Sequence, residues 1–148
     1  MDEKKFDDML QFAIDREIES VRFYTEGSQK MKYSGAKELF LDFAEQEKKH
    51  KQKLEDARKG KISLAHIQNI PDLKISDYLV DSELTPESSY ADILRIAMKR
   101  EERSVKLYTD LKEKNTDKTL LNLFAYLLQE ESKHKYALEK LYDDEVLK

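Results

Sequence analysis

The chain has 148 residues, and its 27 Lys and Arg against 31 Asp and Glu give a formal net charge of −4. This length favours one domain, and mixed charges with a slight acidic excess argue against a nucleic-acid-binding protein, which would show a basic stripe. No apolar run approaches the roughly 20 residues needed to span a bilayer, so we expect a protein that does not enter a membrane. The absence of Cys excludes disulfides and thiolate metal sites, and we expect the protein to be cytoplasmic.

Four helices are predicted along the chain, because only 3 Gly and 2 Pro interrupt a sequence in which 39% of residues are charged. The breaks lie at Ser34-Gly35, Gly60, Pro71, Pro86 and Asn115-Thr116-Asp117. The predicted helices cover about residues 4–32, 36–59, 87–114 and 118–143. Thr85 is the predicted cap of the third helix, with Pro86 at its first helical position.

The segment from about 61 to 86 connects the second predicted helix to the third and carries several apolar residues. A connection of this length is uncommon in a compact domain. Two short-looped hairpins joined by one long crossover match the ferritin-like four-helix bundle. The sequence therefore predicts a single all-α domain over residues 1–148, and the apolar crossover favours a homodimer.

An internal repeat relates the two halves of the chain at an offset of 84 residues, as between Glu17 and Glu101. Residues 13–25 align without gaps on residues 97–109, and residues 47–51 align on residues 131–135. A duplicated helical hairpin would preserve apolar positions first. Here charged positions are preserved too, which packing alone does not require.

A Glu interrupts the apolar stripe near the middle of every predicted helix, and in the second and fourth helices a His follows on the same face, three residues later. The residues so placed are Glu17, Glu47, His50, Glu101, Glu131 and His134. Buried, unpaired carboxylates are costly, and the nearby basic residues fall off these stripes. Two divalent cations would balance four carboxylates, with iron or manganese suiting the mixed ligands and zinc also possible. The alternative is that these side chains lie on solvated faces.

Two tyrosines, Tyr24 and Tyr108, lie seven residues after Glu17 and Glu101 on the same helix faces. As catalytic candidates, their phenols would bond a ligand carboxylate or act as redox-active rings near the metals. The alternative is simple aromatic packing. His66 has no partner at ligand spacing and is expected to be a surface residue. Glu102 and Glu130, beside ligand positions, are expected to be solvated.

At these residues the sequence resembles the rubrerythrin-like branch of the ferritin-like superfamily, over about residues 4–143. The motifs that carry the resemblance are Glu17 with Tyr24, Glu47-Lys48-Lys49-His50, Glu101 with Tyr108, and Glu131-Ser132-Lys133-His134. The resemblance implies a di-iron site, chemistry with O₂ or peroxide, and a homodimer. It implies that Glu47 and Glu131 bridge the metals, that His50 and His134 bind one metal each, and that Glu17 and Glu101 are further ligands.

The chain departs from full-length rubrerythrins in two respects. With no Cys it has no rubredoxin module to deliver electrons, so an external donor protein or small reductant is expected. The additional Glu that rubrerythrins carry one turn from the third-helix ligand is replaced by Met98 and Ser104, unless Glu102 supplies it. The remaining six ligands are closer to the ferroxidase-type pattern of bacterioferritins.

The expected function is therefore that of a di-iron oxidoreductase of the peroxidase or ferroxidase type. The alternative is a non-catalytic protein that binds or carries iron or another metal. A third reading is a structural module in which zinc only stabilises the fold.

Overall fold

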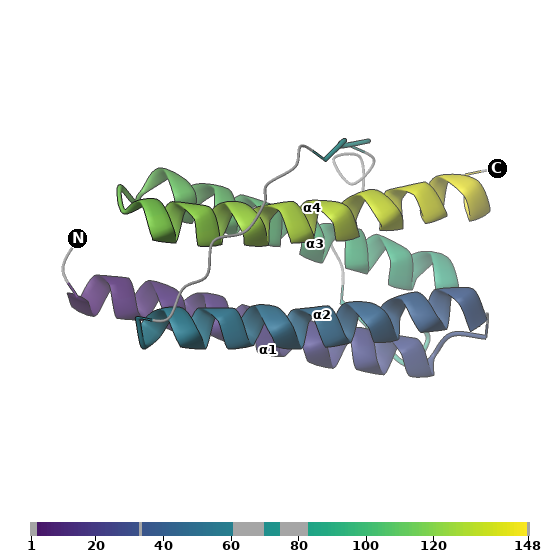
Figure 1. The fold of residues 1–148 in the computed structure, drawn as a ribbon. Helices are drawn as coiled ribbons and strands as arrows, with labels where there is room; N and C mark the ends of the chain where they lie inside the picture. The colour runs from purple at the N-terminus through teal and green to yellow at the C-terminus, as the bar shows by residue number, and fades with distance from the viewer. Residues whose placement is uncertain (1–2, 33, 61–69, 75–82, 148) are drawn as a thin grey trace.

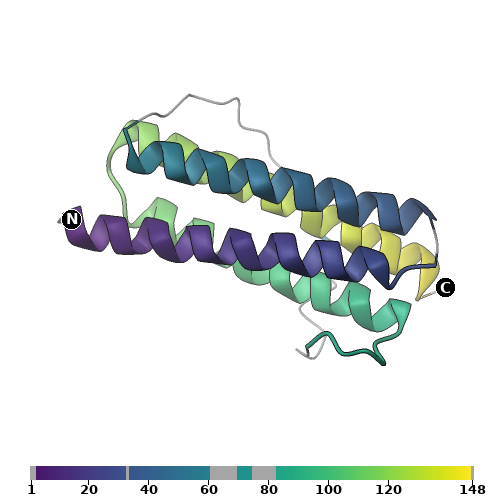
Figure 2. The same cartoon turned by 90° about the horizontal axis from the view of Figure 1, so that it is seen from below.

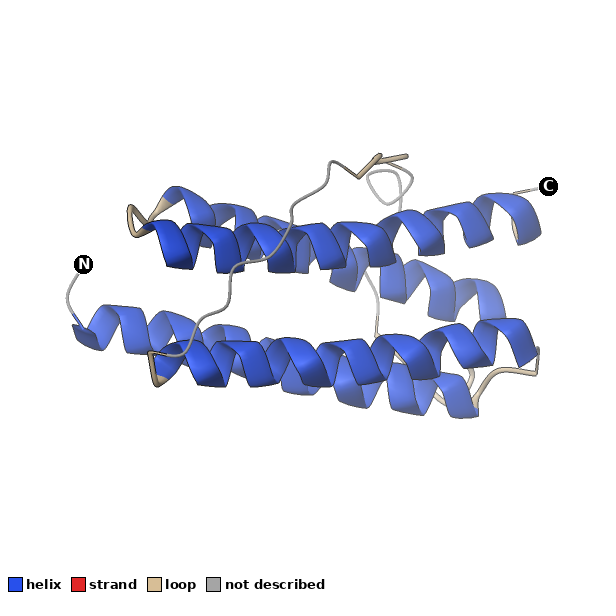
Figure 3. Ribbon diagram, in the orientation of Figure 1, coloured by secondary structure: helices blue, strands red, loops and turns tan. Residues whose placement is uncertain are grey.

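The computed structural model describes residues 3–32, 34–60, 70–74 and 83–147, and in this part of the chain all regular structure is helical (Figure 3). The four helices are α1 (Glu3–Gln29), α2 (Ser34–Arg58), α3 (Tyr90–Glu113) and α4 (Lys118–Glu145). α1 pairs with α2 and α3 pairs with α4, and the two hairpins lie against each other as a bundle (Figures 1 and 2). The predicted all-α, ferritin-like four-helix bundle is confirmed.

The start of α3 corrects the predicted boundary at residue 87. Ser89 caps the helix, because its side chain accepts a hydrogen bond from Asp92 N at 3.1 Å and the Asp92 carboxylate accepts one from Ser89 N at 3.0 Å. This reciprocal capping box satisfies two backbone donors at once. Thr85, the predicted cap, instead accepts a hydrogen bond from Ser88 N in the turn before the helix.

The other helix ends lie close to prediction. α1 stops at Gln29 and not at residue 32, because Lys30 N donates to Gly27 O at 3.1 Å and closes a tighter turn. α4 starts at the predicted residue, since the side chain of Asp117 accepts hydrogen bonds from the backbone of Thr119 and Leu120. It runs two residues beyond the predicted end, to Glu145.

Apolar residues form two clusters along the bundle. One includes Phe40 and Leu94, and the other includes Leu54 and Leu127, all fully buried. In the first cluster a Cβ at Gly27 would lie 3.0 Å from the ring of Phe40, so glycine permits this close approach of α1 and α2.

The connection between α2 and α3 is described only in part. Residues 61–69, which include His66, and residues 75–82 lie outside the described residues, so most of the predicted crossover at 61–86 does too. Asp72 lies against α4, where its carboxylate accepts a hydrogen bond from Lys135 Nζ at 2.5 Å. Among the described helices, none combines the length and apolar character needed to cross a membrane.

Candidate metal centre

The six predicted ligands converge in the middle of the bundle, where each is 1–2% exposed. They form two groups, and within each group the potential ligand atoms all lie within 4.8 Å of one another. One group is Glu17, Glu47, His50 and Glu131, and the other is Glu47, Glu101, Glu131 and His134. The solvated-face alternative does not hold for these side chains. Glu47 and Glu131 belong to both groups, which is the placement expected of bridging carboxylates.

Contacts across the two hairpins repeat in a two-fold pattern. His50 Nδ1 lies 2.9 Å from Glu131 Oε1, and His134 Nδ1 lies 2.9 Å from Glu47 Oε1. His50 Nδ1 is also 3.7 Å from Glu17 Oε2, as His134 Nδ1 is 3.6 Å from Glu101 Oε1. Each imidazole therefore approaches a carboxylate of its own hairpin and one of the opposite hairpin.

The side chains of the two tyrosines bond carboxylates between α1 and α3 in the same two-fold pattern. Tyr24 Oη donates to Glu101 Oε1, and Tyr108 Oη donates to Glu17 Oε1 at 2.5 Å. Burial, together with the charges of these carboxylates, raises the pKa of both phenols well above the usual value. The phenols therefore remain hydrogen-bond donors. Tyr24 also packs edge-on against Phe40, with ring centroids 5.0 Å apart, so it both bonds a carboxylate and fills the core.

The four carboxyl groups divide into two electrostatic pairs. Burial raises the pKa of Glu47 and Glu131 well above the usual value, and the neighbouring charges of Glu17 and Glu101 raise it further. Burial also acts on Glu17 and Glu101, but hydrogen-bonding neighbours outweigh it and lower the pKa of these two. Without a cation, burial and like charge therefore favour the protonated form at Glu47 and Glu131, whereas hydrogen bonding favours the ionised form at Glu17 and Glu101.

The two histidines are also influenced by the carboxylates. Burial lowers the pKa of an imidazole, but the surrounding carboxylates, above all Glu131 for His50 and Glu101 for His134, outweigh it and raise the pKa of both. A metal ion binds the unprotonated forms of carboxyl and imidazole groups, so the raised pKa values oppose metal binding at low pH.

The hydrogen-bonding state of the site fits a metal pair. In the described part of the chain, seven buried side-chain atoms lack a hydrogen-bond partner, and six of them belong to this cluster. They are Glu17 Oε2, both oxygens of Glu47, Glu101 Oε2, Glu131 Oε2 and His134 Nδ1. Even the 2.9 Å approach of His134 Nδ1 to Glu47 Oε1 lacks hydrogen-bond alignment. Buried polar atoms nearly always have partners, and carboxylate with imidazole is a ligand set for divalent transition metals.

The side chain of Gln46 contacts the predicted ligand His134, and the sequence did not identify this residue. Gln46 Oε1 lies 2.7 Å from His134 Nε2, while the Gln46 amide nitrogen donates to Asp42. The only signals in the sequence are the four-residue spacing of Asp42 and Gln46 and the position of Gln46 directly before Glu47. Phe43 stacks on the His134 ring with centroids 3.9 Å apart.

Three charged residues near the ligands are only partly as expected. Glu130 was expected to be solvated, but its side chain is 15% exposed and pairs with Lys133 at 3.1 Å. Glu102 is more open, with its side chain 38% exposed. Lys135 lies off the ligand stripe as expected, yet it is 5% exposed because it bonds Asp72 and lies 3.4 Å from the buried Glu139.

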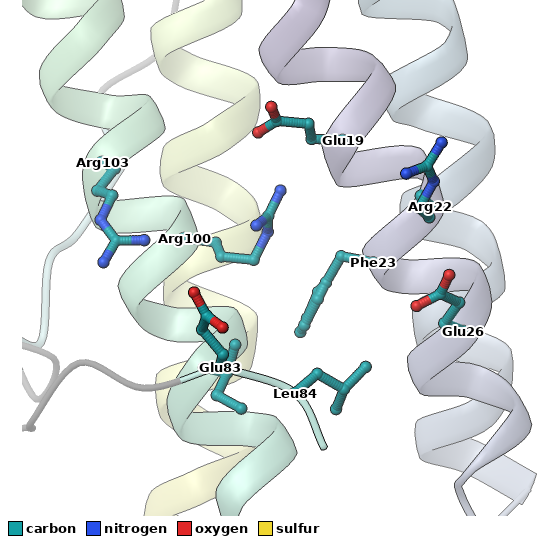
Figure 4. Close-up of a pocket in the computed structure, with 9 residues that line it drawn as sticks. Glu19, Arg22, Phe23, Glu26, Glu83, Leu84, Arg100 and Arg103 are labelled. Carbon is teal, nitrogen blue, oxygen red and sulfur yellow. The ribbon is translucent and has the colours of Figure 1, made fainter. Parts of the chain in front are cut away.

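A separate surface pocket of about 780 Å³ lies between α1 and α3. Figure 4 shows its charged walls, including Glu19, Arg22 and Arg103, with Arg100 beside Phe23. None of the six predicted ligands lines this pocket. Three arginines and three glutamates balance its charge, so it selects neither anions nor cations by charge alone.

Comparison with known proteins agrees with this architecture. A family model described as Rubrerythrin matches residues 8–142. The fold is similar to a solved structure titled "Hypothetical Protein Pfu-1136390-001 From Pyrococcus furiosus", with 31% sequence identity and a TM-score of 0.70. That alignment covers 91% of this chain and 86% of the other chain. The search of curated proteins found no match.

Proposed function

Since this chain belongs to the rubrerythrin family, we propose that it is a di-iron oxidoreductase that reacts with O₂ or peroxide in the manner of a peroxidase or ferroxidase. The observation that carries the proposal is the concentration of unpartnered carboxylate and imidazole atoms in one buried cluster. Four carboxyls and two imidazoles match the ligand set of di-iron four-helix bundles. Manganese or zinc could occupy the same ligands.

The proposed ligand roles follow from membership of the two groups. Glu17 and His50 would hold one metal, Glu101 and His134 would hold the other, and Glu47 and Glu131, which belong to both groups, would be shared by the two metals. Bound iron would supply two-electron redox chemistry toward O₂ or peroxide.

The protein itself would orient the ligands and exclude water. Tyr24 and Tyr108 each hold one oxygen of a terminal carboxylate, and the second oxygen of Glu101 and of Glu17 is buried without a hydrogen-bond partner. The apolar clusters around the centre keep bulk water away from it. Because the sequence has no Cys, we propose that electrons come from a separate donor protein or a small reductant.

A metal-binding or carrier protein without catalysis is the second candidate, because the same buried ligands would serve it. Anaerobic loading with Fe²⁺, followed by peroxide and then an excess of external reductant, separates the two. An oxidoreductase consumes peroxide repeatedly, whereas a carrier oxidises once and stops. Absence of any Fe²⁺ oxidation would refute the redox proposal. The remaining interpretation would then be a structural module in which zinc stabilises the fold.

Matched variants make this experiment specific. Glu17→Gln combined with Glu101→Gln removes one ligand from each metal and should abolish oxidation. Glu19→Gln makes the same chemical change on an exposed face of α1 and should leave oxidation unchanged. We also propose a homodimer, which light scattering of the purified protein would test.

A further inference from the structure

The two histidines of the site are equivalent in the sequence repeat but not in their surroundings. The repeat places Asp42 and Gln46 of α2 in register with Tyr126 and Glu130 of α4. Gln46 contacts His134 from the opposite hairpin, and Asp42 bonds Gln46. Tyr126 and Glu130 are therefore the residues in the corresponding positions for His50. The comparison of these two pairs shows how far the two metal positions differ.

At His134, three side chains form an ordered chain of hydrogen bonds. The Asp42 side-chain oxygen accepts a hydrogen bond from the amide nitrogen of Gln46 at 2.7 Å. The Gln46 oxygen is thereby turned toward His134 Nε2, 2.7 Å away. An amide oxygen is an acceptor, so it selects the form of His134 with hydrogen on Nε2. Nδ1 is then the atom available to a metal, and it faces Glu47 and Glu101.

The stacked ring of Phe43 also restrains the orientation of the His134 imidazole. Its centroid lies 3.9 Å from that of His134, with the planes inclined by 20°. The corresponding position in the repeat is Leu127, which has no ring to stack. The stacked Phe43 ring and the Gln46 oxygen therefore both orient the His134 imidazole.

At His50 the corresponding residues make hydrogen bonds and an ion pair with other side chains. In the described part of the chain, Glu130 accepts from Tyr126 at 3.4 Å, is 3.5 Å from the Gln129 amide and pairs with Lys133 at 3.1 Å. None of these bonds reaches His50. The ring of Tyr126 lies edge-on to His50 with centroids 6.3 Å apart, too far to fix the imidazole as Phe43 does.

We propose that Gln46, oriented by Asp42, is a positioning residue that makes the Glu101–His134 half of the site the tighter of two unequal metal positions. The inference rests on the proposed function, because it presupposes a dinuclear site. Partners of metal-binding histidines typically change metal affinity by about 10–100-fold. The metal affinities of the two halves of the site should therefore differ by a factor in this range.

Metal titrations of the full chain test the proposal without any measurement of activity. Zn²⁺ binding followed by calorimetry, and Co²⁺ binding followed by absorption, should show two events in the unaltered protein that differ by about 10-fold or more. Gln46→Leu should weaken the tighter event by about 10–100-fold and leave the weaker event in place. In the Glu17→Gln variant the tighter event should remain, whereas in Glu101→Gln it should be lost.

Gln52→Leu is the matched control, because Gln52 lies on the same helix and its side chain is exposed and bonds Asp56. It should leave both events unchanged. If Gln46→Leu does not fold, as judged by circular dichroism, Asp42→Ala removes the orienting acceptor at an exposed position and should weaken the same event.

Each result separates the inference from the function beneath it. Equal affinities in the unaltered protein, or a Gln46→Leu effect no larger than that of Gln52→Leu, would overturn the inference and leave the proposed function standing. Weakening of both events to the same extent would also overturn it. Failure of the unaltered protein to bind Zn²⁺ or Co²⁺ at all would overturn the dinuclear site itself.

Discussion

Replacement of Glu47 by leucine should stabilise the metal-free protein while abolishing its response to metal. Glu47 is 1% exposed, and both of its carboxyl oxygens lack a hydrogen-bond partner. Burial and the Glu17 charge both raise the pKa of Glu47, so the metal-free site disfavours a charge on this carboxyl, and leucine removes the unfavourable group. Leucine has a similar volume, so no large cavity forms.

The size of the effect follows from the cost of an unsatisfied buried polar group, about 1–3 kcal/mol. In a domain of this size each kcal/mol shifts the melting temperature by about 2–4 °C. Glu47→Leu should therefore raise the melting temperature in EDTA by about 2–12 °C. The unaltered protein should gain about 2.7 kcal/mol from a metal present at 100 times its dissociation constant, and the variant should gain none.

Thermal unfolding followed by circular dichroism, in EDTA and in excess Zn²⁺, measures both effects. Glu38→Leu, at an exposed position of α2, is the matched control and should change stability in EDTA by less than about 0.5 kcal/mol while keeping the Zn²⁺ response. The reasoning would be refuted if Glu47→Leu melted lower than the unaltered protein in EDTA, or if it kept the full Zn²⁺ response.

Four further predictions concern the site and its surroundings. Tyr24→Phe and Tyr108→Phe should each lower the free energy of unfolding by about 1–3 kcal/mol in urea titrations, because each leaves a buried carboxylate oxygen unbonded; unequal losses would contradict the two-fold arrangement. Metal affinity should rise with pH, since the raised pKa values of two carboxyls and two imidazoles mean that protons must leave, and an indicator dye should detect their release. Lys135→Met should destabilise the protein by about 3–5 kcal/mol in urea titrations, because the fully buried Glu139 loses this cation. Asp72→Asn should cost less than about 1 kcal/mol in the same assay, because its side chain is 50% exposed.

The sequence by itself determined the helices and the residues that share a helix face. The 3.6-residue period of a helix is a local property, so the spacing places Glu47 with His50, and Glu131 with His134, on one helix face each, whatever the rest of the chain does. The offset between the halves then predicts that two equivalent hairpins meet. The structure confirms the all-α bundle and brings these residues together.

Only the tertiary structure decided which side chains meet between helices. Periodicity fixes the face of a helix but not its rotation and height relative to a neighbour. The sequence therefore predicted that the Tyr24 phenol bonds a ligand carboxylate but not that this carboxylate is Glu101, and it did not predict the contact of Gln46 with His134. The cap at Ser89 likewise depended on local bonds with Asp92 that competed with a plausible start at Thr85. Burial of Lys135 required a carboxylate from the distant connection, which no pattern within α4 could reveal.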